Sequence, residues 1–132
     1  MYKYSQMAYY SFEMRSCVTP KGLLGISAAS LKDFDNEISQ IPNDASAPFN
    51  AAASRLEAEL KQAYRFVASI ARESEDLDDI AQLWTAMASF CDSYAERLSD
   101  LHTLHPMCGV GYYYDRVLDI RNTCKRLADL HA

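Results

Sequence analysis

The chain has 132 residues, 49% of them hydrophobic and 23% charged, which fits one globular domain and leaves no room for two ordinary ones. Its formal net charge of −5 disfavours nucleic acids or anionic membranes as partners, because both require a surplus of Lys and Arg. No run of about 18 apolar residues is present, so the sequence predicts no membrane span.

Residues 1–22 are rich in Tyr and Met, and we expect them to form an extension ahead of a helical bundle domain over 23–132. Alternating apolar positions in residues 2–18 resemble a strand, but a helical spacing fits equally well, and we favour the helix. The segment lacks the apolar stretch of a signal peptide. The segment Thr19-Pro20-Lys21-Gly22 is expected to break the chain.

Four stretches carry apolar residues at steps of three and four, as amphipathic helices do. They predict helices over about 24–41, 48–73, 74–105 and 112–131. Ser30 and Asp33 match a capping box, which predicts a firm start of the first helix at Ser30. The average step of 3.5 and the short connections predict an all-α, elongated, antiparallel up-and-down four-helix bundle.

The apolar seam of these helices also predicts the core. The seam of the first helix begins at Leu24. The residues expected to be buried are Leu31, Phe34, Ile38, Leu56, Leu60, Val67, Ile80, Trp84, Met87, Cys91, Tyr94, Leu98, Val117, Ile120 and Cys124.

The four cysteines contain no CxxC pair. Cys91 and Cys124 fall on seam positions, where a free thiol behaves as a small buried hydrophobe. Reduced thiols and the missing signal peptide predict a cytoplasmic location.

The last helix carries the best candidate for a local basic patch. Cations near a helix C-terminus suit the helix dipole, so we interpret the patch as solvated surface rather than a nucleic-acid site. Its residues are Arg116, Arg121, Lys125 and Arg126.

Two hexapeptides, Arg97 to His102 and Arg126 to His131, share the pattern R-L-x-D-L-H. The pattern resembles the Arg-x4-His signature of HEPN-type RNases, which are small helical bundles. The resemblance implies that these Arg and His side chains act on RNA in a groove between two protomers. In an antiparallel pair of helices His102 and His131 lie more than about 20 Å apart, so one site requires a second protomer.

His102, His105 and Cys108 form a second constellation. The i, i+3 spacing places both histidines on one helix face, and His and Cys are zinc ligands. No CxxC or HxxxH anchors the set and a fourth ligand is missing, so these residues are candidates for a metal- or small-ligand-binding bundle, and we expect no cofactor.

Seven of the nine tyrosines gather near the N-terminus and at the start of the last helix, where Tyr113 is predicted to point inward between two tyrosines that flank it. Tyrosine joins an apolar ring to a polar tip and is enriched at interfaces. The interface candidates are Tyr4, Tyr9, Tyr10, Tyr112 and Tyr114.

An acidic bundle with tyrosine-rich ends and no polar catalytic set predicts a non-enzymatic protein-interaction module. An adaptor, a chaperone, an immunity-type protein or a homo-oligomer would fit. The metal-binding bundle and the RNase are the alternatives. Because the polar exceptions to the seam lie at helix ends, we expect function at the ends and the outer surface.

Overall fold

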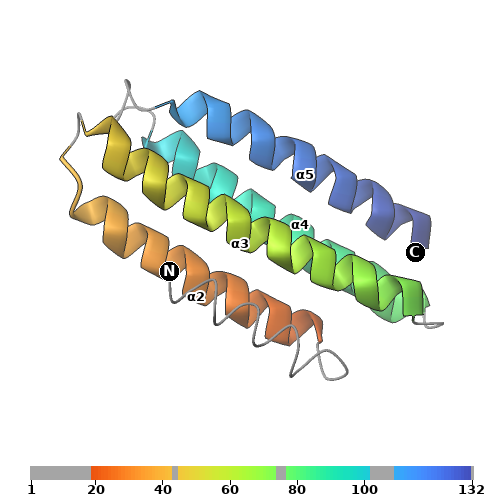
Figure 1. Ribbon diagram of the computed structural model, residues 1–132. Coiled ribbons are helices and arrows are strands. Elements are labelled where there is room, and N and C mark those ends of the chain that lie inside the picture. Colours follow the sequence, from red (N-terminus) through yellow and green to blue (C-terminus); the bar gives the residue numbers. More distant parts are fainter. Residues whose placement is uncertain (1–18, 43–44, 74–76, 102–108, 132) are drawn as a thin grey trace.

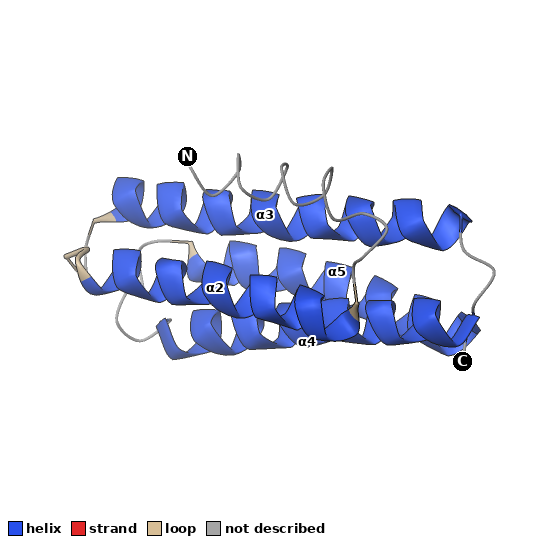
Figure 2. Ribbon diagram, turned by 90° about the horizontal axis from the view of Figure 1, so that it is seen from below, coloured by secondary structure: helices blue, strands red, loops and turns tan. Residues whose placement is uncertain are grey.

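The computed structural model describes residues 19–42, 45–73, 77–101 and 109–131, and within these ranges it contains four α-helices and no strand. The helices are α2 (Pro20–Ser39), α3 (Ser46–Glu73), α4 (Leu77–Leu101) and α5 (Val110–His131). They run side by side along one long axis, and each runs opposite to the one before it (Figures 1 and 2). The predicted elongated up-and-down bundle is confirmed. Of the expected N-terminal extension, residues 1–22, residues 1–18 lie outside the described residues, and residues 20–22 belong to α2.

Helix α2 begins at Pro20, within the segment 19–22 that is expected to break the chain. Thr19 is the N-cap in extended conformation, and its hydroxyl accepts a hydrogen bond from the Gly22 amide at 3.0 Å. Threonine followed by proline is a helix-start signal, since a proline at the first position loses no intrahelical hydrogen bond. The predicted start at Ser30 is wrong, because Ser30 is buried in the middle of α2.

The other helix ends lie close to the predicted ones. Helix α3 begins two residues before Pro48, which the first turn of a helix tolerates. Helix α5 begins at Val110, directly after Gly109, whose φ of 71° is left-handed and favours glycine. The structure describes α4 as far as Leu101, so the predicted continuation to His105 lies outside the described residues.

The predicted core is confirmed at every position except Ile120, which is half-buried and packs against the edge of the core. In α2 only the first position of the expected seam differs: Leu23 is buried at 1% exposure, whereas Leu24 is 42% exposed. Helix α3 buries a further row at seven-residue spacing: Ala52, Glu59 and Phe66. This second row arises because α3 contacts α2 as well as α4.

Helix α4 contacts all three other described helices, and its contact with α5 is the closest in the bundle. Cys91 of α4 and Cys124 of α5 are free, fully buried thiols at this interface. A hydrogen bond with Cys124, together with burial, raises the pKa of the Cys91 thiol well above its usual range. Both therefore act as small core residues, as predicted.

Candidate interaction surface at the start of α5

The first turn of α5 carries the two interface candidates that the structure describes. Tyr112 is 59% exposed, and Tyr114 is half-buried against the core. Tyr113 between them is buried, as predicted. The candidates Tyr4, Tyr9 and Tyr10 lie outside the described residues, so packing of the N-terminal tyrosines against α5 stays a prediction.

Tyr113 anchors this end of α5 to α3. Its hydroxyl lies 3.1 Å from the Ser54 hydroxyl, and its ring meets the ring of Phe49 edge-on at a centroid distance of 6.2 Å. Edge-to-face contact and a hydrogen bond both constrain the ring's orientation. The backbone that carries the neighbouring Tyr112 is therefore held in place.

Tyr112 is itself supported on two sides. Its ring meets that of Tyr113 edge-on at 5.2 Å, and the guanidinium of Arg116 lies 5.1 Å from its ring centre. Arg116 in turn donates two hydrogen bonds across to α3, from Nε to Oε1 of Glu57 at 2.8 Å and from Nη2 to Oε2 at 2.7 Å. Two parallel bonds fix a guanidinium in orientation as well as position. An exposed aromatic ring is thus held by a cation that α3 keeps in place.

The charges in this cluster favour each other's ionised form. The hydrogen bond from Arg116 lowers the pKa of Glu57 despite the opposing effect of partial burial, and Lys61, with Nζ 3.2 Å from Oε2, lowers it further. The same bond with Glu57 raises the pKa of Arg116. At neutral pH Glu57 and Arg116 therefore form a pair of full charges.

Neutralising Glu57 should change the acid sensitivity of the fold. A carboxyl whose pKa is lowered by folding stabilises the protein above its unfolded pKa, about 4.3, and this contribution is lost as the pH falls through the folded value. Between about pH 5 and pH 3, we expect the unfolding free energy of Glu57→Gln to fall less steeply than that of the wild type. Urea denaturation at a series of pH values measures this pH dependence. Asp129→Asn, at an exposed position near the other end of α5, is the control and should lose unfolding free energy with falling pH as the wild type does. The same pH dependence in all three proteins would contradict the role given to the Glu57–Arg116 pair.

The basic residues of α5 do not act as one patch. Arg116 faces α3, whereas Nη1 of Arg121 lies 3.2 Å from Oδ1 of Asp92 on α4. Nη2 of Arg126 donates to the hydroxyl of Thr123 at 3.3 Å. The interpretation of these arginines as simply solvated is incomplete, because two of them tie α5 to different helices.

Interhelical arginine–carboxylate pairs join four pairs of helices in the described part of the chain. Exposed pairs contribute little stability each, but they favour one register of helix against helix. The pairs are Arg55–Glu37 between α3 and α2, Arg97–Asp35 between α4 and α2, Arg116–Glu57 between α5 and α3, and Arg121–Asp92 between α5 and α4.

A groove between α3 and α5 continues this surface along the bundle. Its volume is about 370 Å³. It lies next to the cluster, because Lys61 lines the groove and also contacts Glu57. Its half-buried Tyr64 rests on Trp84 of α4 at a ring distance of 5.1 Å. The lining residues are Lys61, Tyr64, Arg65, Asp119, Ile120 and Thr123.

The residues of the RNase hypothesis are held in different places. Nε of Arg97 donates to both carboxylate oxygens of Asp35, at 2.9 and 3.0 Å. Arg126 lies on α5, and His131 is half-buried at the last position of that helix. His102 lies outside the described residues. The pairing of two such sites across protomers stays a prediction.

The metal hypothesis also concerns residues beyond the described ranges, since His102, His105 and Cys108 all lie there. Across the part of the chain that the structure describes, no group of three or more His, Cys, Asp or Glu side chains is placed to hold a metal ion. The hypothesis for the three undescribed residues stays a prediction. None of the helices in the described ranges is long and apolar enough to cross a membrane.

Comparison with protein-family models, curated proteins and solved structures finds no match to this chain.

Proposed function

We propose that this chain is a non-enzymatic protein-interaction module that binds a partner protein through Tyr112, Arg116 and the adjoining α3/α5 groove. The observation that carries the proposal is the exposed Tyr112 ring, held by Arg116, which Glu57 holds in turn. Contacts that already hold an exposed ring in place lower the entropic cost of binding a partner through it.

Tyrosine and arginine are the residue types that recur where few side chains carry most of a protein interface's binding energy. Binding costs entropy when it immobilises side chains, and this cost is smaller when the side chains are already held. Tyr112 and Arg116 meet both conditions, because their contacts with each other and with Glu57 exist within the single chain.

The groove beside the cluster favours protein over nucleic acid as the partner. It combines the apolar surfaces of Tyr64 and Ile120 with both signs of charge, from Lys61, Arg65 and Asp119. Mixed charge around apolar contacts is typical of protein interfaces, whereas phosphate backbones require a continuous positive surface.

Truncating Tyr112 tests the proposal. We expect Tyr112→Ala to weaken binding of the partner by roughly thirtyfold, the effect of losing one dominant interface residue. Tagged full-length wild-type and Tyr112→Ala proteins would be used to capture proteins from the native cells, with quantitative mass spectrometry. Each recovered candidate would then be purified and titrated against both proteins.

Leu130→Ala is the matched control, because Leu130 is also a large exposed side chain but lies near the opposite end of α5. The expected result is a partner that binds wild-type and Leu130→Ala proteins equally and Tyr112→Ala weakly. Recovery of the same proteins by all three, with equal affinity for the purified candidates, would refute the proposal.

A further inference from the structure

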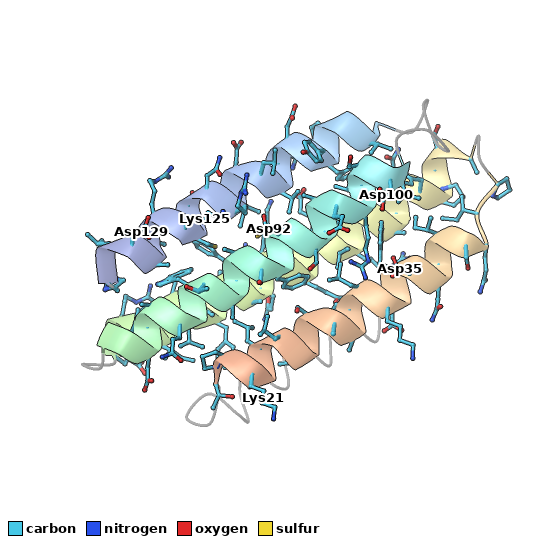
Figure 3. The ribbon with its side chains drawn as sticks, turned by 180° about the vertical axis from the view of Figure 1, so that it is seen from behind. Lys21, Asp35, Asp92, Asp100, Lys125 and Asp129 are labelled. Carbon is cyan, nitrogen blue, oxygen red and sulfur yellow. The ribbon has the colours of Figure 1, made fainter. Side chains whose placement is uncertain are left out.

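A second groove lies between α2 and α4. The surface proposed above, formed by Tyr112, Arg116 and the α3/α5 groove (the Tyr112 surface), lies on the other two helices. Its volume is about 470 Å³, and its lining residues are Asp35, Ile38, Ser39, Glu96, Arg97, Asp100 and Leu101. Figure 3 shows Asp35 on α2 and Asp100 on α4 at the same end of the bundle, on either side of the space between the two helices.

The groove has apolar side chains among its charges. Ile38 belongs to the core and is 8% exposed, and Leu101 is half-buried and packs against the core. A partner's apolar side chain placed here would be removed from water against these two residues, which is the main source of favourable free energy in association.

The charges around this apolar surface are mainly negative. Three carboxylates, Asp35, Glu96 and Asp100, lie around a single guanidinium, that of Arg97. Arg97 is engaged by both oxygens of Asp35 and by the carbonyl of Ser93 at 3.1 Å. Asp35 and Arg97 compensate each other, which leaves the exposed carboxylates of Glu96 and Asp100 to set the sign of the groove.

The backbone adds to this negative field. Helices α2 and α4 run in the same direction, so both C-termini lie at this end of the bundle (Figure 1). The C-terminal end of a helix carries a partial negative charge that Lys, Arg or His in the last turn ordinarily offsets. Over the described ranges, Pro20–Ser39 and Leu77–Leu101, neither α2 nor α4 has a basic residue in its last turn.

We propose that the α2/α4 groove binds a basic amphipathic helical segment of a partner protein. An apolar side chain of that segment contacts Ile38 and Leu101, and flanking lysines or arginines pair with Glu96 and Asp100. Opposite charges across an interface speed association and select the partner. This inference rests on the proposed function, that the chain binds proteins, but it assigns the partner's chemistry to a separate face.

Fluorescence anisotropy with a labelled synthetic helix of leucine and lysine, titrated with the full chain at low salt, tests this inference. A helix with glutamate in place of every lysine is the matched probe. We expect the wild type to bind the Leu/Lys helix and not the Leu/Glu helix. The double variant Glu96→Gln, Asp100→Asn should weaken binding by roughly three- to thirtyfold, since two exposed ion pairs are lost.

The control is the double variant Asp115→Asn, Asp129→Asn, which removes the same net charge from exposed positions on α5. It should bind the Leu/Lys helix nearly as the wild type does. Equal weakening in both double variants would mean attraction to overall charge only, and would overturn the groove assignment. Because Tyr112 is intact throughout, this experiment can fail while the Tyr112 test succeeds, and the reverse also holds.

Discussion

Replacing Tyr94 with alanine is expected to lower the free energy of unfolding by about 3–5 kcal/mol, as truncation of a large buried side chain does. Tyr94 on α4 is 1% exposed, and its ring meets that of Phe34 on α2 edge-on at 5.6 Å. Its hydroxyl donates to the carbonyl of Ala53 on α3 at 3.2 Å. One side chain thus joins three helices, so its removal leaves a cavity at their meeting point.

Tyr94→Phe separates the ring from the hydroxyl. It keeps the packing and removes one buried hydrogen bond, so we expect a loss of about 1 kcal/mol. Ser89→Ala, at an exposed position on the same helix, should change stability by less than about 0.5 kcal/mol. Urea denaturation of the four proteins measures these differences. A Tyr94→Ala loss no larger than that of Ser89→Ala would mean that α2, α3 and α4 do not meet at Tyr94.

The buried thiols should be almost inert in the folded protein. Cys91 and Cys124 are 0% exposed, and the raised pKa of Cys91 keeps it in the unreactive thiol form. In a Cys17→Ser, Cys108→Ser background, we expect a thiol reagent to label them more than about a thousandfold more slowly than in urea, because labelling requires the closely packed α4/α5 interface to open.

Ser89→Cys in the same background is the control, since it places an exposed thiol two positions from Cys91. It should react at the rate of an unfolded cysteine under native conditions. Comparable rates for Cys91 and the Ser89→Cys thiol would contradict the described packing of α4 on α5.

Tyr112 and the α2/α4 groove lie at the same end of the bundle but on different pairs of helices. The Tyr112 surface belongs to α3 and α5, whereas the acidic groove belongs to α2 and α4. Both proposals place binding on the outer surface, which is where we expect function from the positions of the polar exceptions to the seam.

Tyr112 could be predicted from the sequence, but the contacts that hold it could not. The tyrosine cluster marked Tyr112 as an interface candidate, because side-chain chemistry can be read directly. Arg116 was assigned to a basic patch on α5, and Glu57 was not singled out. The two residues lie 59 positions apart, so their pairing depends on how α3 and α5 are rotated and aligned against each other. No local pattern contains that information.

Local periodicity determined the helices and most of the core, because burial of one helix face repeats every three to four residues whatever the partner. It placed Leu60, Val67 and Cys91 in the interior correctly. It assigned Leu24 rather than Leu23 to the seam, since neighbouring positions in a short apolar run differ only in rotation about the helix axis. Only the tertiary structure decided which carboxylate each arginine meets and where grooves remain, because these depend on the register between whole helices.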